Sequence, residues 1–137
     1  MCVEFLAWSA ISDLGRAWEL VEPLPDVGVL LDTFHWQRQR GGPDVPLLAS
    51  IPGERIHYVQ LADAPPEPGA DPETDAMTAR LLPGDGVVDF AQIFSVLDDI
   101  GADPFIATEI FNPGIVAELG ADRAARAMRD AADAVVA

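Results

Sequence analysis

The chain has 137 residues, half of them hydrophobic, which is enough for one domain with a substantial core. Its formal net charge of −15 argues against nucleic-acid phosphates or an anionic membrane surface as partners. A single cysteine, Cys2, excludes an internal disulfide and fits a reducing compartment. Because no long apolar run and no basic leader followed by an apolar stretch is present, we expect neither a membrane span nor a signal peptide, and a cytoplasmic location.

The first half of the chain alternates predicted strands and helices. Residues 1–7 are apolar apart from Glu4 and are expected to form a strand that begins at once. A helix from Ser12 to about Glu22 follows, with Ser12 as its cap. The run from Gly28 to Asp32 is typical of a strand buried on both faces. A short helix is predicted over 44–50 after a Gly-Gly-Pro break.

The second half continues the alternation. Residues 55–62 are predicted to form the third strand, and 64–79, with four prolines and few apolar residues, to form a long mobile loop and candidate lid. Asp89 is expected to cap a helix that runs through Ile100. Residues 105–111 form the fourth predicted strand, and 122–136 the last helix. Four successive βα units indicate an α/β fold with a parallel sheet.

Each predicted strand carries one oxygen-bearing side chain at or near its carboxyl end, and these are Glu4, Asp32, Gln60 and Glu109. The carboxyl ends of parallel strands are where ligands bind in α/β folds. Three carboxylates and an amide are oxygen donors that suit a hard divalent cation, whereas without a metal the carboxylates would repel one another. The alternative is that the four residues are unrelated, with Asp32 capping the next element and His35 packing or facing solvent.

These motifs together resemble the sugar phosphate isomerase/epimerase superfamily, the xylose isomerase-like TIM barrels. The motifs are V-E-F around Glu4, D-T-F-H from Asp32, Y-V-Q-L-A-D around Gln60, R-L-L-P-G-D-G from Arg80 and A-T-E-I-F around Glu109. The resemblance covers the whole chain, residues 1–137, but only the last four of the family's eight βα units. It implies a half-barrel, that is, four βα units of a parallel (βα)8 barrel. Many epimerases have histidine at the position of Gln60. The V-E-F, D-T-F-H, Q-L-A-D and R-L-L-P-G-D-G motifs together are most similar to the 3-dehydroshikimate dehydratase branch and nearby inositol-catabolism members.

The resemblance also implies roles for these residues. Glu4, Asp32, Gln60 and Glu109 would hold a divalent metal, Mg²⁺, Mn²⁺ or Co²⁺, with Zn²⁺ as an alternative. His35 and Arg80 would contact a small polyhydroxylated substrate. The implied reaction is proton removal beside a metal-polarised oxygen, with Glu109 or Glu4 as base in an isomerase or epimerase. In a dehydratase we expect His35 to be the base, since an ordinary histidine pKa of about 6.5 suits work near neutrality.

Other polar and aromatic residues have structural interpretations beside functional ones. Asp63 is expected either to orient Arg80 or a substrate hydroxyl, or to be structural. His57 lies at the wrong end of its strand for chemistry and is interpreted as structural. Three aromatic residues either wall an apolar pocket or belong to the core, and these are Trp8, Phe34 and Trp36.

Four strands alone leave two bare sheet edges and an apolar inner face. We therefore expect one of three situations: the chain forms a homodimer, it pairs with a separate N-terminal half, or it is a truncated product whose partner segment is absent. Two classes of function follow. The first is a metal-dependent lyase or isomerase, and the second is a non-catalytic half-barrel that oligomerises and binds metal without turnover.

Overall fold

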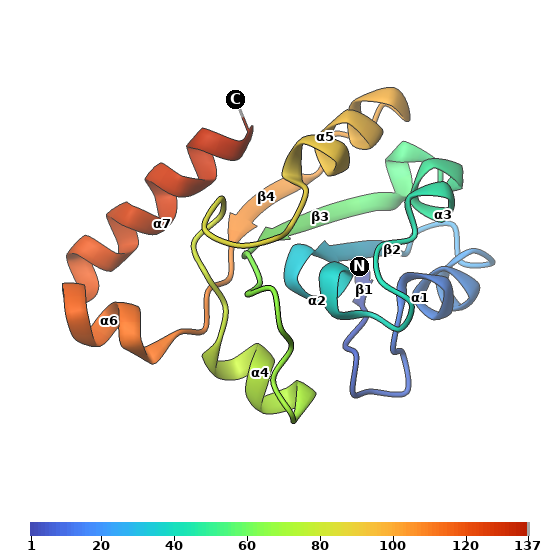
Figure 1. The fold of residues 1–137 in the computed structure, drawn as a ribbon. Helices are drawn as coiled ribbons and strands as arrows, with labels where there is room; N and C mark the ends of the chain where they lie inside the picture. Colours follow the sequence, from blue (N-terminus) through green and yellow to red (C-terminus); the bar gives the residue numbers. More distant parts are fainter. Residues whose placement is uncertain (137) are drawn as a thin grey trace.

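The computed structural model describes residues 1–136 and contains one sheet of four parallel strands in the order β1-β2-β3-β4 (Figure 1). The strands are β1 (Cys2–Glu4), β2 (Gly28–Asp32), β3 (Ile56–Leu61) and β4 (Phe105–Thr108). The helices are α1 (Leu14–Val21), α2 (Thr33–Arg38), α3 (Val45–Ser50), a 3₁₀ turn (Gly53–Arg55), α4 (Pro72–Thr78), α5 (Phe90–Asp99), α6 (Pro113–Leu119) and α7 (Ala121–Val136). The α/β half-barrel expected from the sequence is therefore confirmed, and no helix of the described residues is long and apolar enough to cross a membrane.

One face of the sheet is covered by helices. Contacts run in chain order from α1 to α3, from α3 to α5 and from α5 to α7, so these helices form a continuous outer layer. The strand side chains under that layer are fully buried, as at Val29, Leu31, Val59 and Leu61. In a (βα)8 barrel the helices likewise form an outer layer around the strands, and this chain has half of such a barrel.

The other face of the sheet is largely uncovered. Strand register places Leu30, Tyr58 and Phe105 side by side on it, and the Phe105 side chain is 77% exposed. The Tyr58 and Phe105 rings lie 6.3 Å apart. In a complete barrel this face would be interior, so the chain displays part of a core that nothing within it covers.

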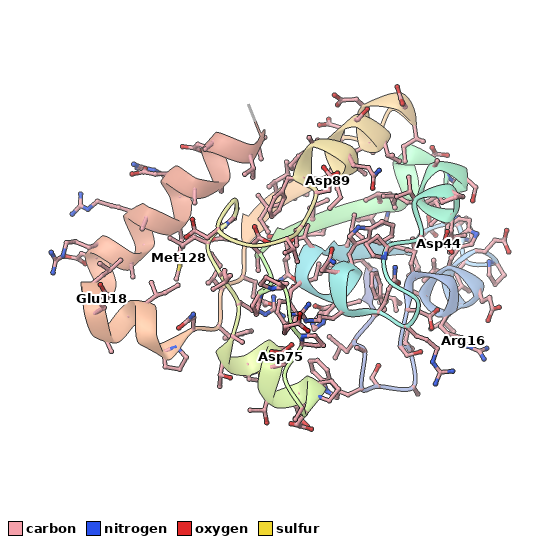
Figure 2. All side chains as sticks on the ribbon, in the orientation of Figure 1. Arg16, Asp44, Asp75, Asp89, Glu118 and Met128 are labelled. Atoms are coloured by element: carbon pink, nitrogen blue, oxygen red, sulfur yellow. The ribbon has the colours of Figure 1, made fainter. Side chains whose placement is uncertain are left out.

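Local sequence explains where the helices begin. Asp13 caps α1 by accepting a hydrogen bond from the Arg16 amide, whereas Ser12, the expected cap, donates its hydroxyl to Asp13. Asp89 caps α5 as the sequence predicts, and Asp44 caps α3 (Figure 2). A cap satisfies backbone amides that have no partner in the first helical turn.

Three short helices were not expected, and these are α2, α4 and α6. Helix α4 lies inside the segment predicted as a loop, because Asp71 caps it and Pro72 occupies its first turn, where a missing N–H costs nothing. Helix α6 begins a few residues after β4, with Asn112 as its cap. The outer strands are also shorter than predicted, ending at Glu4 and Thr108, although the Glu109 amide still donates to the Leu61 carbonyl (3.1 Å).

Candidate metal and substrate site

Strand register brings the four predicted metal ligands to one edge of the uncovered face. Asp32 pairs with Gln60, and Gln60 with Ala107, two residues before Glu109. Glu4 pairs with Leu30, two residues before Asp32. Because paired residues of parallel strands and residues two apart share a face, all four side chains project from the same side at the carboxyl ends.

Asp32 is the centre of this cluster and is completely buried. Its Oδ1 accepts hydrogen bonds from the Phe34 amide (2.8 Å) and the His35 amide (3.0 Å), so Asp32 is the cap of α2. Its Oδ2 accepts from Arg80 Nη1 at 2.6 Å. Asp32 therefore caps the next element, as one interpretation of the sequence expected, while its second oxygen faces Arg80 and its role as a metal ligand stays a prediction.

Glu4, Asp32 and His35 each place one potential ligand atom within 4.8 Å of the other two. Glu109 lies next to them, with its Oε2 3.5 Å from Arg80 Nη1 and its Oε1 accepting from Gln60 Nε2 at 3.1 Å. The four predicted ligands thus form one group that also includes His35 and Arg80. Sequence reasoning named all six residues, but it missed that Arg80 lies among the carboxylates.

The carboxyl groups of Glu4 and Glu109 are perturbed by this environment. Burial raises the pKa of Glu4 from 4.5 to about 7, the negative charges of Asp32 and Glu109 add to the rise, and Arg80 opposes it. Burial likewise raises the pKa of Glu109, while Arg80 acts in the other direction. Clustered carboxylates of this kind favour either protonation or a cation between them.

The His35 ring is buried and neutral. Burial lowers its pKa to about 4, with Arg80 acting in the same direction and Asp32 against it. Its Nε2 lies 3.1 Å from Arg80 Nη2, and because a guanidinium has only donors, Nε2 must be the acceptor. The ring proton is therefore on Nδ1, which is buried without a hydrogen-bond partner. The approach of Nε2 to Glu4 Oε1 (3.8 Å) is not an ion pair near neutral pH.

These observations change the reasoning that made His35 the base. The sequence argument used an ordinary pKa of about 6.5, whereas the buried ring has a pKa near 4. His35 is unprotonated near neutrality, as a base must be, but its lone pair is held by Arg80. For His35 to accept a proton, Arg80 must first move away from it.

The residues fit a divalent cation. Gln60 Oε1 is buried and has no hydrogen-bond partner among residues 1–136, which is costly unless something else satisfies that oxygen. It lies in a group of three carboxylates, which is the donor set that hard divalent ions prefer. An amide oxygen without a partner among mutually repelling carboxylates is the arrangement that an oxygen-rich coordination site presents.

Asp63 has a structural role. It is 1% exposed, and its two oxygens accept hydrogen bonds from four backbone amides, those of Ala64, Gly84, Gly86 and Val88. A side chain at position 86 would collide with the Ala64 carbonyl, so glycine is required there. Asp63 thus fixes the turn that follows Arg80 and contacts neither Arg80 nor the carboxylate cluster by a hydrogen bond.

The remaining sequence candidates separate into two groups. Phe34 and Trp36 belong to the core, and the His57 ring contacts the Met1 carbonyl (3.0 Å) at the opposite end of the strands. Trp8 packs edge-on against His35, with ring centroids 5.2 Å apart. It also lines a hollow of about 240 Å³ beneath α4, so Trp8 connects this hollow to the site.

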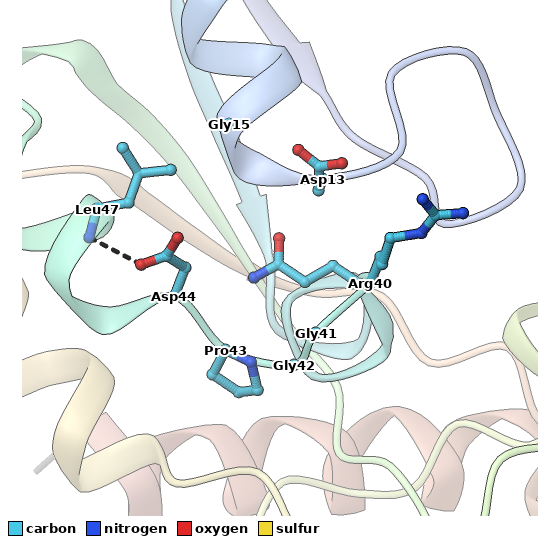
Figure 3. Close-up of a pocket in the computed structure, with 9 residues that line it drawn as sticks. Asp13, Gly15, Arg40, Gly41, Gly42, Pro43, Asp44 and Leu47 are labelled. Carbon is cyan, nitrogen blue, oxygen red and sulfur yellow. Dashed lines mark hydrogen bonds between the residues drawn. The ribbon is translucent and has the colours of Figure 1, made fainter.

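A second hollow of about 240 Å³ lies between the starts of α1 and α3 (Figure 3). Asp13 and Asp44 line it, but each is already engaged as a helix cap. Gln39, also in its lining, accepts from the Leu14 amide at 2.9 Å. None of the clustered carboxylates lines this hollow, which is a junction between helices rather than part of the site.

Comparison with known proteins agrees with this geometry. The chain is 34% identical over 133 residues to a 3-dehydroshikimate dehydratase of Pseudomonas putida, covering 95% of this chain and 19% of that protein. It is 26% identical to an inosose isomerase of Halalkalibacterium halodurans, covering 92% of this chain and 43% of the relative. A solved structure described as IOLI protein with a binding zinc atom superposes with a TM-score of 0.86 at 24% identity, covering 98% of this chain and 48% of that one.

The chain therefore spans less than half the length of these relatives, and its relatives are dehydratases and isomerases. The family described as xylose isomerase-like TIM barrel matches residues 1–132. With its four parallel βα units and the acidic cluster at their carboxyl ends, the chain belongs to the xylose isomerase-like TIM-barrel family.

Proposed function

We propose that this chain is the metal-binding half of a divalent-metal-dependent lyase or isomerase that acts on a small polyhydroxylated substrate. The observation that carries the proposal is that the carboxylates of Glu4, Asp32 and Glu109 lie together with the Gln60 side chain. The amide oxygen of that glutamine has no hydrogen-bond partner among the described residues. The 3-dehydroshikimate dehydratase relative supports a dehydroshikimate-like substrate, and the inosose isomerase relative supports a cyclic polyol ketone as the second candidate.

The bound metal would polarise a substrate oxygen and so acidify the neighbouring C–H bond. Arg80, whose planar guanidinium suits a carboxylate or paired hydroxyls, would orient the substrate. In the dehydratase reaction His35 Nε2 would take the proton, after which a β-hydroxyl leaves. In the isomerase reaction Glu109 or Glu4 would take the proton and return it to the neighbouring carbon.

Adding Mn²⁺ is expected to raise the melting temperature of the chain by several degrees, because ligand that binds only the folded state stabilises it. Glu109→Gln should remove most of this rise by converting a charged ligand to a neutral one. Glu118→Gln is the matched control, since Glu118 is exposed on α6 (Figure 2) and should leave the rise unchanged. A melting temperature that Mn²⁺ does not change would refute the metal site.

The non-catalytic half-barrel is the alternative, and turnover distinguishes it from the enzyme. The assay uses this chain in a barrel completed by four further βα units, with Mn²⁺ present. The rate of protocatechuate release from 3-dehydroshikimate should fall by at least about a hundredfold in His35→Ala. Metal binding with no turnover of 3-dehydroshikimate or inosose would favour the non-catalytic alternative.

We further propose that the uncovered face docks the N-terminal four βα units of a family barrel rather than a second copy of this chain. Leu30, Tyr58 and Phe105 offer it an apolar surface, and β1 and β4 are the open edges of the sheet. Two copies would each bring a charge of −15 and would place both acidic clusters inside one barrel. The share of the relatives' length that this chain covers also leaves room for four more units.

Light scattering tests this choice of partner. The chain alone is expected to be monomeric. It should form a 1:1 complex with the preceding four βα units of the Pseudomonas putida relative, and Phe105→Asp should prevent that complex by placing a charge in the apolar surface. A stable homodimer that this segment does not displace would identify a second copy as the occupant.

A further inference from the structure

All three side-chain nitrogens of Arg80 donate hydrogen bonds to neighbouring residues. Arg80 is 2% exposed. Nε donates to the Ala76 carbonyl (2.9 Å), Nη1 to Asp32 Oδ2 (2.6 Å) and to the Glu109 carbonyl (2.9 Å), and Nη2 to His35 Nε2 (3.1 Å). A buried guanidinium needs this many acceptors, and here they include the central carboxylate and the candidate base.

Two aromatic rings hold the same guanidinium. The Arg80 Cζ atom lies 5.1 Å from the centre of the Phe34 ring and 5.3 Å from that of Phe111. Phe34 comes from α2 and Phe111 from the segment after β4, so the cation is stabilised from two elements of the fold.

The oxygens of Asp32 are not equivalent. Oδ1 is committed to two backbone amides that begin α2, and releasing it would cost the helix its cap. Oδ2 is held by Arg80 alone among the described residues. A cation that uses Asp32 as a ligand must therefore take the oxygen that Arg80 occupies, or share it with a positive charge only a few ångströms away.

We propose that Arg80 is the counter-cation of the metal-free site, and that a bound metal ion displaces its guanidinium from Asp32 Oδ2 and His35 Nε2. The same displacement releases the lone pair of His35 for proton transfer and leaves the guanidinium free to meet an anionic or hydroxyl group of the substrate. This inference rests on the metal site of the proposed function. It adds that metal and Arg80 compete for the same carboxylate, which couples metal entry to assembly of the base.

The test is the Mn²⁺ affinity of the whole chain, measured by isothermal titration calorimetry, together with its melting temperature without metal. All four proposed ligands are in this chain, so no partner is needed. Arg80→Met is expected to bind Mn²⁺ at least about tenfold more tightly than the native chain, because the competing charge is gone. Its metal-free form should melt at a lower temperature, because the carboxylates lose their counter-ion.

Arg38→Met is the matched control. Arg38 is a partly buried arginine beside the same Phe34 ring, with Nε 3.0 Å from Asp75 Oδ2 and Cζ 5.3 Å from the ring centre, but it makes no hydrogen bond to the carboxylate cluster. Its replacement removes one positive charge of the chain and should change Mn²⁺ affinity less than about twofold. A general charge effect would instead strengthen binding equally in both variants.

The remaining outcomes are separable. Mn²⁺ binding to Arg80→Met with native or weaker affinity would overturn the competition while leaving the metal site intact. Absence of Mn²⁺ binding to the native chain and to every variant would refute the proposed function itself. If Arg80→Met does not fold, Arg80→Gln, which keeps a hydrogen-bonding side chain without the charge, should show the same tightening.

Discussion

Asp32→Ala is expected to lower the free energy of unfolding by about 3–5 kcal/mol, the loss typical of breaking a buried ion pair from one side. The variant leaves the Arg80 guanidinium buried without its shortest partner and removes the cap of α2. Both effects act on the same segment, since α2 begins at the residue after Asp32. Urea unfolding followed by circular dichroism would measure the change.

Asp13→Ala is the control for capping alone. Asp13 caps α1 through the Arg16 amide but forms no ion pair, so its loss should cost about 1 kcal/mol. The double variant Asp32→Ala with Arg80→Met should be more stable than Asp32→Ala, because the orphaned charge is removed as well. Equal losses in Asp32→Ala and Asp13→Ala would mean that the buried pair contributes little beyond the cap.

Mn²⁺ affinity is expected to rise about tenfold per pH unit between about pH 5 and 7 and to level off above that range. The pKa of Glu4 in the metal-free chain is raised to about 7, so a proton must leave Glu4 before it can act as an anionic ligand. Calorimetry in buffers of different ionisation enthalpy would also detect the released proton. A pH-independent affinity would contradict the role of Glu4.

The stability of the metal-free chain should respond to pH with the opposite sign. Because folding raises the pKa of Glu4 from 4.5 to about 7, the folded state holds more protons than the unfolded state in that window. The contribution of Glu4 to stability is therefore present at low pH and is lost as the pH rises through 7. Glu4→Gln should remove this contribution and leave the shallower pH dependence of Glu109, whose pKa is raised in the same direction.

Much of the site could be predicted from the sequence because strand ends are visible in it. Apolar runs that finish in a carboxylate or an amide identified Asp32 and Gln60, and strand register places them side by side. The sequence alone does not show which charged side chains contact one another, such as Arg80 and Asp32. The position of Arg80 depends on how the segment after α4 returns to the sheet, and that return is held by the bridge between Asp63 and Leu81 and by the backbone amides that donate to the Asp63 side chain.

The missed helices have a similar physical origin. Proline content argued for an unstructured loop at 64–79, yet Pro72 at the start of α4 favours a helix once Asp71 caps it. What stabilises α4 in place is an interaction distant in sequence, the ion pair between Arg38 and Asp75, which is nearly buried. Local propensity does not report contacts of that kind, so the interpretation of this segment required the structure.

The strand order has a consequence for how the polypeptide is made. Each strand pairs with the one synthesised just before it, so no pairing has to wait for a distant segment. A sheet with this order can grow one βα unit at a time, because each new strand finds its partner already synthesised. The last strand to emerge, β4, carries the exposed Phe105 and Ile106. In this order of synthesis the exposed apolar side chains of β4 emerge only after β1, β2 and β3 are available to pair.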